Sequence, residues 1–412
     1  MKITKISSAY TSYLEMFYRQ NPKVAAMPYG EQKAALDRDA FGLADFWSMA
    51  MEPLGYRMQE LTRNATPLQL AWARENGLAG LETDLRTIAV KQVRQFQPEI
   101  LWYSDTDEEL LLQILDAVPS ICLVFGSVGS AIPRTGVWKH LDLVLSCAPE
   151  AVASMEKAGH TAAHLHHGFD PRVSGRLINR PKSVDASFIG QVVRSGGVHR
   201  QREEFLLAIA KETGLSIFSP SAGFTIRDDV RASAKSAVYR LAHGLRKTGL
   251  PESWVAALPL LGQTLSWEAA PVKPVSSRLR PFLRPAAFGI EMYQVIRDSC
   301  VTLNIHADSS PLFASNMRLF ETTGTGTCLV TDWRDNIPEL FTPDVEVVTY
   351  RNAAECVEKI NWLVAHPRER EAIASAGMRR TLSEHTFENR AVELDRIIRS
   401  ALAKGRRTKR SS

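Results

Sequence analysis

Short apolar runs alternate with longer segments of helical periodicity along most of the chain. Apolar runs of strand length occur at 100–103, 120–125, 141–146 and 161–166. Between these runs, apolar residues recur at the three- and four-residue spacing of an amphipathic helix. The same alternation resumes after residue 185. Strands that alternate with helices predict parallel, doubly wound sheets, and hence an α/β fold.

The first half of the chain is predicted to form one such unit. Residues 1–9 are typical of a first strand, and 29–55 have a helical spacing that Pro53 should end. Further helices are predicted at 68–76, 81–96, 107–117 and 149–158.

The second half repeats the pattern after a break. Residues 174–185 are rich in Gly, Asn, Pro and Lys, which predicts a linker between two domains. The strands predicted beyond it are 186–189, 215–218, 301–305, 328–331 and 345–349. The helices predicted beyond it are 199–213, 290–298, 353–365, 369–385 and 388–403.

One short segment of the second half carries the clearest candidate chemistry. A helix is predicted to begin at Asn316 and to end at Gly324, before the apolar strand. Arg318 and Glu321 lie three residues apart, so they should share one face of this helix. A helix N-terminus and an arginine both suit a phosphate. A carboxylate one turn further can accept hydrogen bonds from sugar hydroxyls. The segment therefore predicts a site for a nucleotide diphosphate.

Several longer sequence pieces occur in a fixed order around this segment. They are Phe288-Gly-Ile-Glu-Met-Tyr293, Leu303-Asn-Ile-His306, Asn316-Met-Arg-Leu-Phe-Glu321, Thr331-Asp332, Pro338-Glu339-Leu340-Phe341, Glu369-Arg370 and His385-Thr386. In this order they resemble the donor-binding region of GT-B glycosyltransferases, specifically the CgeB-like branch of the family 1/4 type. The resemblance covers 285–395, and more weakly 183–220. It implies two Rossmann-like domains that face a cleft, with a helical insert in the second.

The resemblance also implies the domain limits. Residues 1–178 would form the acceptor-side domain, 183–387 the donor-binding domain, and 388–405 a helix that crosses back to the first domain. The insert, 221–284, is rich in basic residues and contains Trp254 and Trp267. It is predicted to form either a helical hairpin packed on the domain or a surface for a membrane or lipid-linked acceptor.

The resemblance implies transfer of a sugar from a nucleotide-diphosphate sugar to a glycan, lipid-linked or protein acceptor, in the synthesis of a surface glycan or glycoconjugate. The alternatives are a nucleotide-sugar epimerase of the same fold and a non-catalytic nucleotide-sugar-binding or coat-assembly protein. Catalytic roles are predicted for Arg318, Glu321 and His306. Donor contacts are predicted for Gly190, Asn304, Asp308, Asn316, Met317, Arg318, Glu321 and Gly324.

The chain departs from the broader family pattern at one position. Related enzymes carry a second glutamate eight residues before the first, and this chain has Phe313 there. The candidates to substitute for that carboxylate are Asp308, Ser309 and Ser310. His306 is a further candidate, and it could equally brace its loop by hydrogen bonds. Beside Gly190, the charge for the donor phosphates could come from Arg194 or Arg200.

No metal or cofactor is predicted, and the nucleotide sugar is a co-substrate. Asp105-Thr106-Asp107 follows a strand and resembles a metal-binding DxD motif. However, Thr106–Glu109 also suits a helix N-cap followed by acidic first-turn residues, which we prefer. His164, His166 and His167 do not share one strand face and have no further ligand at suitable spacing.

Composition places the protein among ordinary globular proteins. A chain of 412 residues with 45% hydrophobic and 23% charged residues suits two domains. The five cysteines show no CxxC spacing, and the first residues show no leader pattern. We therefore expect a cytoplasmic protein, with peripheral contact at the inner membrane face as an option through 221–284, and no nucleic-acid partner. The basic tail, 404–410, is expected to fray.

Overall fold

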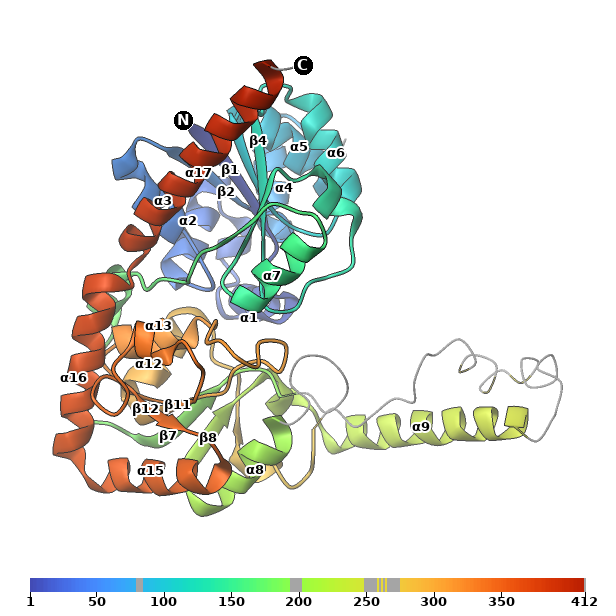
Figure 1. The fold of residues 1–412 in the computed structure, drawn as a ribbon. Helices are drawn as coiled ribbons and strands as arrows, with labels where there is room; N and C mark the ends of the chain where they lie inside the picture. The colour runs from blue at the N-terminus through green and yellow to red at the C-terminus, as the bar shows by residue number, and fades with distance from the viewer. Residues whose placement is uncertain are drawn as a thin grey trace.

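Two six-stranded parallel sheets form the framework of the molecule (Figure 1). A computed structural model describes residues 1–78, 84–192, 202–247, 258, 261, 264 and 275–410. The strand order is β2-β1-β3-β4-β5-β6 in the first sheet and β12-β11-β10-β7-β8-β9 in the second. Every strand pair in both sheets is parallel. The predicted α/β architecture is therefore confirmed.

The first sheet and its helices occupy the amino-terminal part of the chain. Its strands are β1 (Lys2–Ser7), β2 (Arg57–Thr62), β3 (Ile100–Ser104), β4 (Leu123–Val128), β5 (Leu143–Ser146) and β6 (Ala162–His164). Its helices are α1 (Thr11–Gln20), α2 (Tyr29–Asp39), α3 (Phe46–Met51), α4 (Thr66–Glu75), α5 (Leu85–Phe96), α6 (Glu108–Ala117) and α7 (Pro149–Lys157).

One prediction for this part was wrong, and one strand was not predicted. The long helix expected over 29–55 is broken into α2 and α3, because Ala40 and Ala44 adopt left-handed backbone conformations with φ of 58° and 38°. A helix cannot continue through such residues. Strand β2 was missed because it lies at the edge of the sheet, where only Leu61 is fully buried and the apolar pattern is weak.

The second sheet is built in the same way. Its strands are β7 (Val184–Ile189), β8 (Leu215–Phe218), β9 (Leu283–Arg284), β10 (Ser299–Asn304), β11 (Cys328–Asp332) and β12 (Val348–Tyr350). Its helices are α8 (Arg202–Glu212), α12 (Gly289–Asp298), α13 (Arg318–Gly324), α14 (Ile337–Leu340), α15 (Ala353–Ala365) and α16 (Pro367–Glu384). Its central strands are almost wholly buried, as expected for a parallel sheet covered on both faces.

The last helix, α17 (Phe387–Arg410), runs from the second domain back over the first (Figure 1). The Tyr56 hydroxyl donates a hydrogen bond to Asp395 Oδ1 at 2.7 Å. Leu394 and Ile398 are fully buried in a cluster that also contains Trp47. The helix continues to Arg410. The basic tail, 404–410, was expected to fray, and this expectation was wrong because these residues are helical.

The insert has two structurally different parts. Helix α9 (Ile226–Lys247) projects away from the second domain (Figure 1), and Val230 and Leu241 on it are 62% and 56% exposed. The end of the insert instead belongs to the domain, since Leu279 is fully buried and β9 pairs with β8. Trp254 and Trp267 of the insert lie outside the described residues. Within the described part of the chain, no helix is both long and apolar enough to cross a bilayer.

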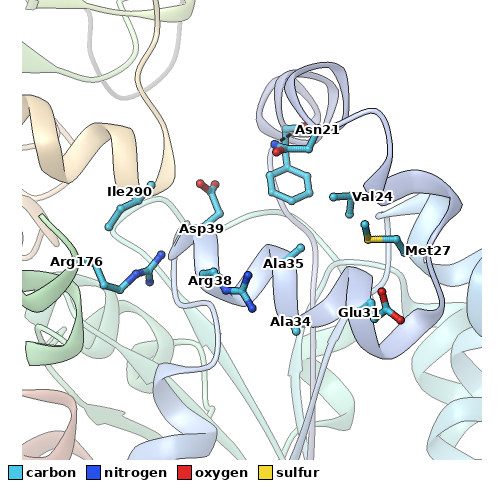
Figure 2. A pocket seen from close by; sticks show the side chains of 11 residues that line it. Asn21, Val24, Met27, Glu31, Ala34, Ala35, Arg38, Asp39, Arg176 and Ile290 are labelled. Carbon is cyan, nitrogen blue, oxygen red and sulfur yellow. Dashed lines mark hydrogen bonds between the residues drawn. The ribbon is translucent and has the colours of Figure 1, made fainter.

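The two domains meet where α2 ends and α12 begins. Gly289 has a φ of 55°, and a Cβ built on it would lie 2.2 Å from Asp39 Oδ2, so only glycine suits this contact. Figure 2 shows Asp39 and Ile290 on one wall of a pocket of about 520 Å³ beside this junction. Arg176 of the connecting segment lines the same pocket. The junction therefore joins α2, the interdomain connection and α12.

Candidate functional site

A cleft of about 590 Å³ lies between the domains, and its walls come from both sheets. Its first-domain wall includes the end of β1 and the start of α1, and its second-domain wall includes β7, β10 and α13. Ligands of open parallel sheets bind beyond the carboxyl ends of the strands. This cleft is therefore the candidate site.

Arg318 and Glu321 form an ion pair in this cleft, with Arg318 Nη1 at 2.8 Å from Glu321 Oε2. Their predicted common helix face is confirmed. Glu321 is only 5% exposed, and the Tyr293 hydroxyl lies 3.5 Å from its Oε1. Arg318 Nη1 also lies 3.1 Å from Met292 Sδ. The pair is thus held between α13 and α12.

The helix that carries this pair begins two residues later than predicted, at Arg318, with Met317 as its N-cap. Asn316 does not cap it. Its Nδ2 instead donates to Asn304 Oδ1 at 2.6 Å, and Asn304 Nδ2 donates to Thr331 Oγ1 at 3.0 Å. The Asn316 side chain therefore bonds to Asn304 at the end of β10 and not to the first turn of the helix. Asn304, Asn316 and Met317 nevertheless all line the cleft, as their predicted donor contacts require.

Arg202, at the start of α8, is a cleft residue that the sequence reasoning missed. It is 8% exposed, and it donates to the carbonyl oxygens of Ile305 at 2.8 Å and Gln191 at 3.2 Å. Its guanidinium lies 5.4 Å from the centroid of the Phe188 ring.

The charge of Arg202 is only partly compensated. Burial lowers the pKa of its guanidinium to about 10, although Asp332 and Asp308 attract the charge from a distance. Within the described part of the chain, no carboxylate forms an ion pair with it, and its Nε has no hydrogen-bond partner. A buried cation in this state favours an anionic ligand. The arginines proposed from the sequence for this role, 194 and 200, lie outside the described residues.

His306 is held below the cleft surface by a carboxylate. Its Nδ1 lies 2.7 Å from Asp332 Oδ1, and its backbone N–H also donates to that oxygen at 3.1 Å. Burial alone would raise the pKa of Asp332, but His306 and Arg334 outweigh it and hold that pKa below its usual value. The contacts are those of the loop-bracing alternative, although His306 Nε2 is buried without a partner in the described structure. The catalytic role stays a prediction.

The remaining predicted donor residues are Gly190, Asp308 and Gly324, and none of them is among the residues that line the cleft. Gly190 follows Ile189, which does line the cleft, and an added Cβ would meet the Phe188 ring at 3.2 Å. Asp308 is exposed beside the cleft. At Gly324, an added Cβ would lie 2.4 Å from the Phe169 ring, so this glycine serves close packing. Their donor contacts remain predictions.

The DxD-like triplet is engaged in internal contacts. Asp107 accepts a hydrogen bond from the backbone N–H of Leu110 at 3.2 Å, so a helix cap is confirmed here, but at Asp107 rather than at Thr106. Asp105 Oδ2 lies 2.7 Å from Arg63 Nε and accepts a hydrogen bond from Ser8 Oγ at 2.8 Å. Among the residues that the structure describes, no group of three or more His, Cys, Asp or Glu side chains could hold a metal ion.

Only one of the three neighbouring histidines lines the cleft. His164 and His166 pack edge to face with ring centroids 4.1 Å apart, while His167 lies in the cleft wall. Burial and the nearby Arg390 lower the pKa of His167 to about 4. His167 is therefore a neutral hydrogen-bonding group near neutral pH.

Two carboxylates line the first-domain wall, and neither was identified from the sequence. Glu60 on β2 pairs with Lys5 on β1 at 2.8 Å. Asp37 on α2 pairs with Lys33 at 2.5 Å, yet burial raises the pKa of Asp37. Glu60 was not identified because strand β2 was not predicted. Asp37 was not identified because the helix predicted over 29–55 gave no sign that α2 ends near this residue, at the cleft.

Comparisons with known proteins bear on the fold and on the class of protein. Residues 253–396 match a family model described as glycosyl transferase-like. No curated protein sequence is detectably similar to the chain.

Solved structures resemble the whole chain. Anabaena HepE in complex with UDP and glucose has 12% identity and a TM-score of 0.50, covering 97% of this chain and 100% of that chain. Sucrose-phosphate synthase from Thermosynechococcus elongatus has 11% identity and a TM-score of 0.51, covering 98% and 100%. AviGT4, a glycosyltransferase involved in avilamycin A biosynthesis, has 11% identity and a TM-score of 0.52, covering 98% of each chain. The fold is GT-B.

Proposed function

We propose that the protein is a metal-independent glycosyltransferase, of the CgeB-like type, that uses a nucleotide-diphosphate sugar as its donor. Arg202 carries this proposal, because it is a buried cation in the cleft without an ion-pair partner among the described residues. Arg318 lines the same cleft. The match to a glycosyl transferase-like model and the HepE complex with UDP and glucose support the choice of ligand.

In this mechanism an acceptor hydroxyl oxygen attacks the anomeric carbon of the donor sugar. The bond from that carbon to the diphosphate breaks, and its electron pair leaves on the diphosphate. Arg202 and Arg318 would stabilise the negative charge that develops there. Glu321 would accept hydrogen bonds from the nucleotide ribose. Asp37 is our candidate to accept the hydroxyl proton, because burial raises the pKa of this carboxyl.

Substitution of Arg202 tests the proposal directly. A thermal-shift screen of the wild type against UDP-, GDP-, TDP- and CMP-sugars should identify one stabilising nucleotide. Arg202→Met should weaken its binding by about tenfold or more, the loss of one charge-assisted contact. Arg94→Met removes an exposed arginine on α5 and is the matched control. Equal nucleotide affinity in both variants would exclude Arg202 as a phosphate ligand.

The alternative activities give different products. A transferase should release nucleotide diphosphate, slowly by donor hydrolysis and faster with an acceptor. An epimerase of the same fold would yield the epimeric sugar. A non-catalytic binding or coat-assembly protein would bind the nucleotide sugar and leave it intact. Product analysis by NMR of one donor incubation separates the three.

We also propose that the protein acts in the cytoplasm and contacts the inner face of the membrane through α9. All five cysteines are free, which supports a reducing compartment. The basic residues of α9 outnumber its two aspartates and are Arg227, Arg231, Lys235, Arg240, Arg246 and Lys247. Exposed apolar residues lie beside them on the same helix. This combination favours an anionic lipid surface.

Vesicle sedimentation tests this contact. The wild type should bind vesicles that contain phosphatidylglycerol, and less so at high salt, because salt screens exposed charges. The double substitution Val230→Glu and Leu241→Glu should abolish binding. Val392→Glu changes an exposed apolar residue on α17 and serves as the control, since Val392 is 41% exposed. Binding that survives the double substitution would rule out α9 as the contact.

A further inference from the structure

Tyr10 is a large aromatic residue that is held in place but left exposed. It follows β1 as the N-cap of α1, lines the cleft, and is 69% exposed. An exposed aromatic face at the carboxyl end of a parallel strand stands where ligands of open α/β sheets bind. Among the large hydrophobic side chains that the structure describes, Tyr10 has the highest exposed fraction, and its place in the cleft wall makes it available to a ligand.

The backbone around Tyr10 is fixed by its neighbours. The backbone N–H of Ala9 donates to Asn64 Oδ1 at 2.9 Å, and Asn64 Nδ2 donates back to the Ala9 carbonyl oxygen at 2.8 Å. Ser8 is tied to Asp105, which is itself paired with Arg63. The loop that presents Tyr10 is therefore ordered before any ligand arrives, which lowers the entropic cost of binding.

Other aromatic rings support Tyr10 from behind. Phe41 meets Tyr10 edge to face at 5.7 Å between ring centroids, and Tyr13 stacks on Phe41 at 3.8 Å. Phe288 of the second domain contacts Phe41 at 5.5 Å. The Tyr10 ring thus stands at the front of an aromatic group while its own surface faces the cleft.

The charges of the cleft wall differ between the two domains. The described charged residues of the first-domain wall are Lys5, Asp37 and Glu60, and each carboxylate is paired with a lysine, so this wall is close to neutral. Those of the second-domain wall are Arg202, Arg318 and Glu321, so arginines outnumber carboxylates. Anionic phosphate therefore suits the second-domain side. A neutral ligand with hydroxyl groups suits the first-domain side, where carboxylate and serine oxygens can accept its hydrogen bonds.

We infer that the acceptor which reacts in this cleft is a carbohydrate, and that the apolar face of its ring stacks on Tyr10. This inference rests on the proposed transferase function and specifies its acceptor. A sugar ring has a C–H face that can pack on an aromatic side chain. It also has hydroxyl groups, which can donate hydrogen bonds to the carboxylate and serine oxygens of the wall. A phosphate-bearing lipid would instead need a cation on this wall, and the one described there, Lys5, is already paired with Glu60.

Saturation-transfer NMR with defined probes tests the inference. The probes are methyl glucoside, methyl galactoside, methyl mannoside and methyl maltoside, with farnesyl phosphate as the competing class. We expect at least one glycoside to bind the wild type. Tyr10→Ala should weaken its binding by about tenfold. Tyr10→Phe keeps the ring and should bind the glycoside as the wild type does.

Two further readings separate the possible outcomes. Nucleotide affinity should be the same in all three proteins, because the ring contact of Tyr10 is to Phe41 of the first domain. Thermal stability should be the same in the wild type and Tyr10→Phe, and slightly lower in Tyr10→Ala, which loses the contact with Phe41. The inference is overturned if no glycoside binds the wild type, if Tyr10→Ala binds it normally, or if farnesyl phosphate is the probe that binds at Tyr10. Glycoside binding is measured without nucleotide. A protein that fails to bind nucleotide would therefore refute the proposed donor, while the glycoside result would still test the inference about Tyr10.

Discussion

Replacing Arg318 by alanine should destabilise the protein as well as abolish nucleotide binding. The side chains of Arg318 and Glu321 are 16% and 7% exposed and lie 2.8 Å apart. After the substitution Glu321 would keep a buried charge, and its remaining neighbour, the Tyr293 hydroxyl, is 3.5 Å away. Removing one partner of a buried ion pair costs about 3–5 kcal/mol. Because Arg318 retains some exposure, we expect a loss near the lower limit, about 3 kcal/mol.

A double substitution separates this structural cost from the functional one. Arg318→Met with Glu321→Gln removes both charges and leaves no buried ion, so it should lose about 1–2 kcal/mol less than Arg318→Ala alone. Urea unfolding at pH 7 gives the free energies of unfolding, and nucleotide titration gives the affinity. Both variants should fail to bind nucleotide. The reasoning is refuted if Arg318→Ala unfolds at the wild-type urea concentration, or if the double variant still binds nucleotide.

Three further results are expected. EDTA should leave sugar transfer unchanged; activity that is lost with EDTA and restored by Mn²⁺ or Mg²⁺ would show a metal requirement. Burial holds the pKa of His167 and His385 at about 4, below the usual 6.5, so the native state binds fewer protons than the unfolded chain between these pH values. Their contribution to stability is therefore present above pH 6.5 and lost as the pH falls toward 4, by about 1.4 kcal/mol per pH unit for each histidine, measurable by urea unfolding across this range; a flat profile would contradict it. Gly289→Ala should destabilise by at least about 1–2 kcal/mol, because its backbone is left-handed. Adding Asp39→Ala should not rescue it, since the Asp39 carbonyl oxygen would still lie 2.5 Å from the new Cβ, and full rescue would contradict this contact.

Local patterns were enough to predict most elements of the second domain. Helix α15 occupies 353–365 and strand β8 occupies 215–218, as predicted, because each carries a complete apolar pattern between clear ends. In the first domain β2 has little apolar patterning, and α2 ends at residues with left-handed backbone conformations rather than at a proline. Edge strands and such breaks depend on neighbours in space, so local periodicity does not reveal them.

The sequence by itself determined the α/β alternation, and hence the parallel sheets, because short apolar runs alternate with segments of 3.6-residue periodicity. It also determined the shared face of Arg318 and Glu321, because residues three apart lie on one side of a helix. Only the tertiary structure placed Arg202 and Asp37 in the same cleft, since they lie far apart in the chain on different domains. It also decided that Asn316 bonds to Asn304 instead of capping a helix. Burial, charge compensation and the choice between competing hydrogen-bond partners arise from contacts between distant segments, and these contacts exist only once the chain has folded.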